Sequence, residues 1–190
     1  MKSAVGLVGK IRCGKLSVGK IITRELTKLG YSVVTHTFSD VLVDTQKLWH
    51  LPPGRETLQK ISLGIQDKFS GGLAHAVKQR ALSAKEDVVI LDGLRWINSD
   101  LKILRDLPNS RLIYIDAPAE VRWRRSLRDP QKLDEANASF EQFLARDNAR
   151  TEVEIPLFRE HSDVAIDNSV DDMGRLEHQV LKFLNFGINL

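Results

Sequence analysis

The chain has 190 residues, of which 42% are apolar, which is enough to bury the core of one compact domain. Its net charge of +3 suits a polyanionic small ligand and is smaller than the net positive charge of most nucleic-acid-binding proteins. One cysteine excludes an internal disulfide, the histidines lack the spacing of a zinc site, and no apolar run reaches membrane-spanning length. We therefore expect a cytoplasmic protein with no membrane or nucleic-acid partner and no structural zinc.

The first motif of the chain lies between a predicted strand, residues 3–8, and a predicted helix. It reads Gly9-Lys-Ile-Arg-Cys-Gly14-Lys15, which is a glycine, four residues, a glycine and a lysine. The glycines let the backbone turn so that successive N–H groups converge on a phosphate at the positive end of the helix. An overlapping match that ends at Lys20 would need a strand through a basic run, so we favour the first register. The plain alternative is a glycine-rich turn. The predicted donor-binding residues are Gly9, Lys10, Ile11, Arg12, Cys13, Gly14, Lys15, Leu16 and Ser17.

Position 16 departs from this motif. A serine or threonine usually follows the loop lysine and ligates Mg²⁺ through its hydroxyl, whereas this chain has Leu16. Ser17 comes next, but helical geometry turns it about 100° away from position 16, so it is a doubtful metal ligand. The motif therefore indicates phosphate binding and leaves open whether Mg²⁺-dependent turnover is efficient.

Helices and strands alternate along the rest of the chain. The pattern predicts further strands over 32–38, 87–91, 111–115 and 163–166. It predicts helices over 16–29, 40–49, 55–69, 73–84, 101–107, 139–150 and 171–184, and one between 116 and 129. This alternation favours a single α/β domain with a doubly wound, parallel, five-stranded sheet and right-handed crossovers.

Two charged segments fall where such sheets bind ligands. Asp92-Gly-Leu-Arg95 follows the strand 87–91 and places an acid and a base at its carboxyl end. Four arginines, at 122, 124, 125 and 128, crowd the helix after the fourth strand. The alternatives are that Asp92 is a turn residue and that the four arginines form a solvated helix face.

The order of these motifs resembles the nucleoside-monophosphate-kinase group of P-loop kinases, which includes adenylate kinase, dephospho-CoA kinase and phage deoxynucleoside monophosphate kinases. The resemblance covers nearly the whole chain. It implies a P-loop NTPase fold of the nucleotide-kinase type, with a helical acceptor-binding insertion at about 40–75, a lid at about 122–150, and ATP and Mg²⁺ as cofactors. It rests on the segments GLVGKIRCGK, TFSD, GRETLQKIS, VVILDGLR, IDAPAEVRWRRSLRD and AIDN.

The resemblance also implies roles for single residues. Lys15 and the loop amides would hold the donor's β and γ phosphates, and Asp92 would hold Mg²⁺ through water. Arg95 would bind the phosphate of the acceptor, with Arg55 as a second clamp. Asp40 would lie near the acceptor hydroxyl or phosphate, although capping a helix is an equal alternative for an aspartate there.

Further arginines would complete the donor side. Arg124 and Arg128 would contact the donor base and phosphates, and Arg146 or Arg150 would approach from the far side of the lid. A loop at about 129–138 would close over the donor and exclude water, which would otherwise accept the phosphate. The expected catalytic residues are Lys15, Asp92, Arg95, Asp40 and Arg128.

The expected function is ATP-dependent phosphoryl transfer to a nucleoside or deoxynucleoside monophosphate, by a monomer or a homodimer. Within the enzyme class the alternative acceptor is dephospho-CoA, suggested by the segment RRSLRD. An alternative of another class is a nucleotide-binding module with little turnover, because Leu16 replaces the Mg²⁺ ligand. An RNA-binding protein that uses the arginine-rich helix is the least supported, since the aromatic sheet motifs are missing.

Overall fold

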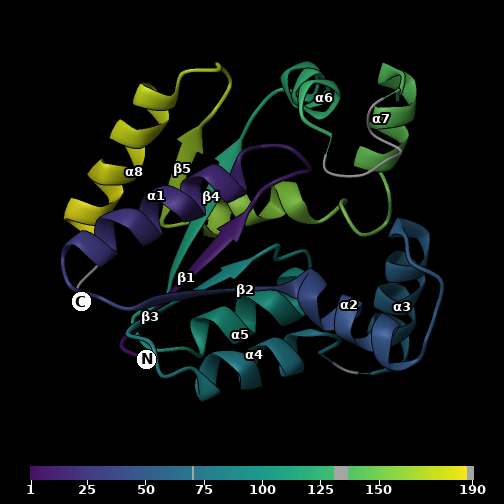
Figure 1. Cartoon of the computed structure of the whole chain (residues 1–190), viewed down its shortest axis with the longest axis horizontal. Helices are drawn as coiled ribbons and strands as arrows, with labels where there is room; N and C mark the ends of the chain where they lie inside the picture. Colours follow the sequence, from purple (N-terminus) through teal and green to yellow (C-terminus); the bar gives the residue numbers. More distant parts are fainter. Residues whose placement is uncertain (70, 131–136, 188–190) are drawn as a thin grey trace.

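A computed structural model of the chain describes residues 1–69, 71–130 and 137–187 and arranges five strands of these ranges in one sheet (Figure 1). The order in the sheet is β2-β3-β1-β4-β5, and each neighbouring pair is parallel. The predicted fold class is therefore confirmed. The strands are β1 (Ser3–Val8), β2 (Val33–Thr37), β3 (Val88–Asp92), β4 (Arg111–Asp116) and β5 (Val164–Asp167).

The central strand, β1, is buried along its whole length. A continuous apolar run suits a strand that is covered on both faces. Leu7 pairs with Asp92 of β3, and Val8 pairs with Tyr114 of β4, so the carboxyl ends of three strands lie at one edge of the sheet. The loop of residues 9–15, which we call the phosphate loop, leaves β1 at this edge, where ligands bind in parallel α/β sheets.

Helices cover both faces of the sheet, which makes it doubly wound (Figure 1). One face packs against α1 (Lys15–Lys28) and α8 (Met173–Gly187), with Ile22, Leu26 and Val180 in the core. The other face packs against α4 (Ala74–Ser83), the π-helix η1 (Ile97–Leu101), α5 (Lys102–Arg105) and the 3₁₀-helix η2 (Ile155–His161). No helix in the described ranges has both the length and the apolar content to cross a membrane.

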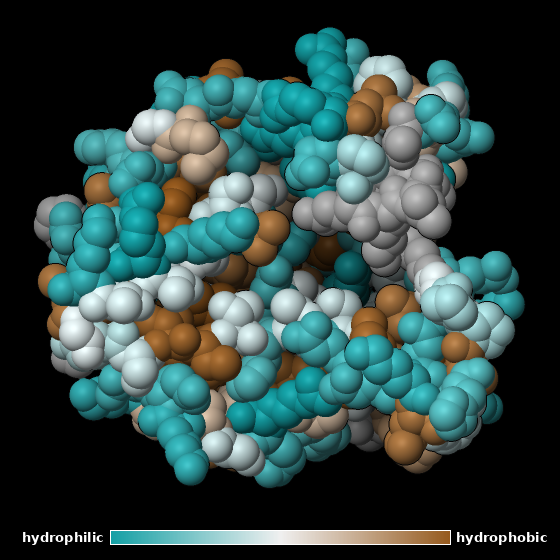
Figure 2. Space-filling model, viewed as in Figure 1, coloured by the Kyte–Doolittle hydropathy of each residue, from teal (hydrophilic) through white to brown (hydrophobic). Residues whose placement is uncertain are grey.

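Two helical pairs extend from the carboxyl edge of the sheet. The first consists of α2 (Phe38–Leu48) and α3 (Arg55–Lys68), and the second of α6 (Ala119–Arg128) and α7 (Phe140–Asp147). Both pairs lie on the same side of the molecule (Figure 1), and Figure 2 shows the surface hollowed between them. Arg12 and Lys15 of the phosphate loop line cavities that face both pairs.

In two segments the secondary structure differs from the sequence prediction. The helix predicted over 101–107 begins earlier, at Ile97, as a π-helix, because the buried Asp100 carboxylate accepts the backbone N–H groups of Arg95 and Trp96 and shapes the turn. The 3₁₀-helix η2 was not predicted. It forms where Ile155 and Phe158 are buried against the sheet, a spacing too short to show helical periodicity.

Candidate active site

The phosphate loop is shaped by a close approach of the chain after β5. Gly14 has a φ of +108°, and a Cβ at this position would lie 2.3 Å from Nδ2 of Asn168. Only glycine fits such a left-handed and crowded position without strain. The same Asn168 amide donates a hydrogen bond of 2.8 Å to the carbonyl oxygen of Cys13. The loop conformation is therefore held from outside as well as by its own glycines.

Lys15 begins α1 and turns its side chain back over the loop. Its Nζ donates to the carbonyl oxygen of Gly9 at 2.7 Å and to that of Lys10 at 3.3 Å. The ammonium thus lies beside the N-terminal end of α1, where backbone N–H groups and the helix dipole favour an anion. Together these groups provide positive charge for a phosphate.

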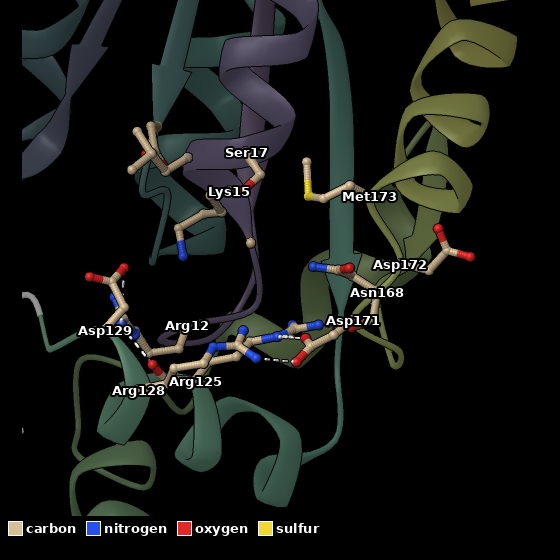
Figure 3. Close-up of a pocket in the computed structure, with 13 residues that line it drawn as sticks. Arg12, Lys15, Ser17, Arg125, Arg128, Asp129, Asn168, Asp171, Asp172 and Met173 are labelled. Atoms are coloured by element: carbon tan, nitrogen blue, oxygen red, sulfur yellow. Dashed lines mark hydrogen bonds and ion pairs between the residues drawn. The ribbon is translucent and has the colours of Figure 1, made fainter.

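Two cavities meet at the loop. The first, about 460 Å³, lies between the loop, α6 and the start of α8, and we call it the α6 cavity (Figure 3). The second, about 270 Å³, lies between the loop, the α2–α3 pair and the segment after β3, and we call it the α3 cavity. Three residues line both cavities: Arg12, Lys15 and Asp92. The site therefore has room for two ligands that meet at the loop lysine.

Asp92 ends β3 with one carboxylate oxygen, Oδ1, buried and without a hydrogen-bond partner among the described residues. Burial raises the pKa of Asp92, against the lowering effects of Lys15 and Arg95, and the negative charge of Asp40 adds to the rise. An orphaned carboxylate oxygen beside a phosphate loop fits a hydrated Mg²⁺. Leu16 offers no oxygen, and its side chain is exposed on the first turn of α1.

No group of three or more His, Cys, Asp or Glu within the described ranges could hold a metal ion. Asp92, with its unpartnered carboxylate oxygen, is the described residue that would hold a Mg²⁺ ion, through water.

The four arginines of α6 separate into different environments. Arg125 and Arg128 both pair with Asp171, at 2.8 Å each, and line the α6 cavity (Figure 3). The hydrogen bond from Arg125 has the larger effect and that from Arg128 the next, and both lower the pKa of Asp171. Arg124 is exposed, lies 3.9 Å from Glu120 and lines neither cavity. The fourth, Arg122, is buried and donates to the carbonyl oxygen of Ile11 in the loop at 3.2 Å.

The α3 cavity contains a buried acid that contacts the predicted acceptor arginine. Arg95 forms an ion pair with Glu152 and donates to the carbonyl oxygen of Thr151 at 3.2 Å. The Glu152 side chain is buried, and its Oε2 has no hydrogen-bond partner in the described part of the chain. Asp100 also lines this cavity, and burial raises its pKa to about 6 against its hydrogen bonds from the Arg95 and Trp96 amides.

No family model and no curated protein sequence matches the chain, whereas many solved structures do. Shikimate kinase from Bacteroides thetaiotaomicron aligns with a TM-score of 0.57 and 15% identity over 96% of each chain. Shikimate kinase from Acinetobacter baumannii in complex with shikimate gives 0.55 and 16% over 96% of this chain and 92% of that one. A gluconokinase from Sinorhizobium meliloti gives 0.53 and 13%, with coverage of 97% and 92%. The chain has the fold of P-loop kinases.

Within this P-loop kinase fold, several predicted residues lie at the cavities. Gly14, Leu16 and Ser17 line the α6 cavity, and Ile11 lines the α3 cavity. Lys10 points elsewhere, because its Nζ donates to the carbonyl oxygen of Asp147 at 2.9 Å.

Asp40, Arg146 and Arg150 are predicted site residues that line neither cavity, although the charge of Asp40 acts on Asp92. Asp40 caps α2 by exchanging hydrogen bonds of 3.1 Å with Thr37, and it lines neither cavity. Arg146 also lines neither, and Arg150 pairs with Asp67 at 2.6 Å. Arg55 begins α3, but its side chain lies outside the described part of the structure, as do residues 131–136 of the predicted lid loop. The functional roles of these residues stay predictions.

The sequence analysis assigns no role to Asn168, Glu152 or Asp100, which line the cavities. Asn168 directly follows β5, so its position at the carboxyl end of a strand was a usable signal. Glu152 and Asp100 are acids in segments without periodicity, and only burial distinguishes them from surface acids.

Proposed function

We propose that the protein is an ATP-dependent kinase that transfers a phosphoryl group to a nucleoside or deoxynucleoside monophosphate. One observation carries the proposal: Arg12, Lys15 and Asp92 line both cavities. A reaction between two bound molecules needs two adjoining sites, with charge-bearing groups where the molecules meet.

The α6 cavity suits the donor. The loop amides and Lys15 would bind its phosphates, while Arg125 and Arg128 lie along the same cavity. Bound ATP would supply the phosphoryl group, and bound Mg²⁺ would neutralise part of the phosphate charge. Because Arg125 and Arg128 share Asp171, their guanidinium groups are already oriented when the donor arrives.

The α3 cavity suits the acceptor. Arg95 presents a guanidinium that Glu152 holds in place, and a guanidinium binds phosphate oxygens in a planar, bidentate way. Leu42, Leu58 and Trp96 give the cavity an apolar wall for a base or sugar. A monophosphate carries between one and two negative charges near pH 7, so its oxygen attacks without needing a general base. The remaining task is positioning and charge stabilisation, which Lys15 and the arginines perform.

The test is a coupled ADP-release assay with ATP, Mg²⁺ and a panel of ribo- and deoxyribonucleoside monophosphates, together with dephospho-CoA as the alternative acceptor. We expect ADP release that depends on one class of acceptor and disappears in Lys15→Ala. A panel in which no acceptor raises ADP release above the acceptor-free rate would refute the kinase proposal.

A second candidate acceptor is a hydroxylated organic acid. Thr37, Ser39 and Ser62 line the α3 cavity together with the acids Asp100 and Glu152, and such groups bind hydroxyls. The structural neighbours named above include kinases of this kind. Adding shikimate and gluconate to the panel separates this candidate from the monophosphates.

A third candidate is a nucleotide-binding module with little turnover, which the exposed Leu16 in place of a hydroxyl favours. Calorimetry with ATP in Mg²⁺ and in EDTA distinguishes it. Binding that barely depends on Mg²⁺, without ADP release, would support the module, whereas strong Mg²⁺ enhancement with turnover would exclude it.

A further inference from the structure

Arg12 occupies an unusual position in the phosphate loop. It is the third of the four residues between the glycines, and its φ of +63° lies in the left-handed region. A long side chain rarely adopts this conformation, which costs on the order of 1 kcal/mol or more. The Arg12 side chain is also only 7% exposed, although a guanidinium is among the groups most costly to bury.

The contacts of Arg12 satisfy only part of its guanidinium. Nη2 donates to the carbonyl oxygen of Arg125 at 2.9 Å and lies 3.8 Å from the carboxylate of Asp129. Nε is buried and has no hydrogen-bond partner among the described residues. Figure 3 shows Lys15, Arg12 and Asp129 gathered on one side of the α6 cavity. A charged group therefore lies at the meeting point of the two cavities with donor capacity left over.

Backbone strain and a buried N–H group without a partner both lower stability, and here they coincide in one residue. A glycine at this position would remove both costs, since it adopts the left-handed conformation freely and buries no charge. Groups that are costly for the fold persist where they serve a ligand. The ligand at this place is the one that spans the two cavities.

We propose that the Arg12 guanidinium is a catalytic residue that binds the phosphoryl group during transfer, a role that rests on the kinase function proposed above. The bond from the transferred phosphorus to the donor's bridging oxygen breaks, and its electron pair stays on the departing diphosphate. A bond from an acceptor phosphate oxygen to that phosphorus forms. Arg12 remains protonated throughout and donates N–H groups to the equatorial oxygens, where charge develops.

This role compensates for the substitution at position 16. Leu16 cannot help to place Mg²⁺ against the phosphates, so less metal charge is fixed by the protein at the reacting group. A guanidinium carried by the loop itself supplies fixed positive charge at the same place. Lys15 alone is a single point charge, whereas the planar Arg12 guanidinium can donate to two oxygens at once.

The experiment compares wild type with Arg12→Gly, Arg12→Lys and the control Arg105→Ala. Arg105 is a matched control because it pairs with Asp163 at 2.9 Å. Asp163 directly precedes β5, so this pair lies at the amino-terminal end of the strand, away from the phosphate loop. For each protein we would measure kcat with the best acceptor of the panel, the Kd for ATP by calorimetry, and Tm.

We expect Arg12→Gly to lower kcat by about 100- to 1,000-fold, the usual loss when one transition-state donor is removed. The Kd for ATP should change little, and Tm should be unchanged or higher because the strain is relieved. Arg12→Lys should recover only part of kcat, and Arg105→Ala should match wild type. This combination distinguishes a catalytic residue from one that only stabilises the loop, because replacing a stabilising residue would lower Tm and weaken ATP binding together.

Two results would overturn the role of Arg12 alone: an active wild type with kcat unchanged in Arg12→Gly, or a loss of kcat fully accounted for by weaker ATP binding and a lower Tm. A wild type that transfers no phosphoryl group to any acceptor would refute the kinase proposal and this role with it. The two failures are therefore distinguishable.

Discussion

Arg122 of α6 and Asp147 of α7 form a buried ion pair, with guanidinium nitrogens 2.5 and 2.8 Å from the two carboxylate oxygens. Lys10 of the phosphate loop lies 3.1 Å from the same carboxylate. Burial by itself would raise the pKa of Asp147, but the Arg122 and Lys10 contacts outweigh it and lower the pKa. One carboxylate thus joins the loop to both helices of the α6–α7 pair.

Asp147→Ala should lower the free energy of unfolding by about 3–5 kcal/mol, because it leaves two cations without their buried partner. Urea unfolding measures this change. The matched control is Arg150→Ala, which breaks the exposed pair with Asp67 and should change the free energy of unfolding far less, because solvent screens an exposed pair. Equal losses in the two variants would mean that burial adds nothing to the Asp147 pair.

Lys15→Ala should lower kcat by about 1,000-fold or more while leaving Tm close to wild type, because its ammonium serves the phosphates rather than the core. ADP release and thermal unfolding test the two halves of this statement. Lys28→Ala, at the exposed end of the same helix, is the control and should keep full activity. A Lys15→Ala protein that retains activity would show that another group holds the transferred phosphate.

Leu16→Ser should raise turnover and strengthen its dependence on Mg²⁺. Restoring one oxygen ligand is worth about 1 to 3 kcal/mol, or roughly ten- to a hundredfold in rate. Steady-state kinetics over a Mg²⁺ titration measure both effects. Leu29→Ser, another exposed leucine just after α1, should change neither. Turnover that is unchanged or lower in Leu16→Ser, with the fold intact, would mean that the site is adapted to leucine.

Asp100 should make the protein less stable as pH rises from about 4 to about 6. Its pKa is about 6 in the folded protein against an ordinary value of 3.8, so the unfolded chain loses its proton first and unfolding is favoured in this interval. The shift corresponds to about 3 kcal/mol. Urea unfolding of wild type and Asp100→Asn at pH 4 and pH 7 isolates this group. A difference between the two proteins that is the same at both pH values would contradict the shift.

Local sequence patterns were sufficient for the phosphate loop and the parallel sheet. The apolar run before Gly9 and the glycine spacing of the loop each depend on residues close in the chain, so periodicity and turn chemistry reveal them. The same holds for Asp92-Gly-Leu-Arg95, because the end of a strand is a local feature whose place in a parallel sheet is known in advance.

The sequence by itself thus determined the layered fold, the loop and the edge of the sheet at which both cavities lie. Only the tertiary structure decided which charges face the cavities. Four arginines close together in the sequence divide into a buried pair with Asp147, two partners of Asp171 and the exposed Arg124. Their partners lie on later elements of the chain, and burial and ion pairing between such distant segments leave no periodic trace in the sequence.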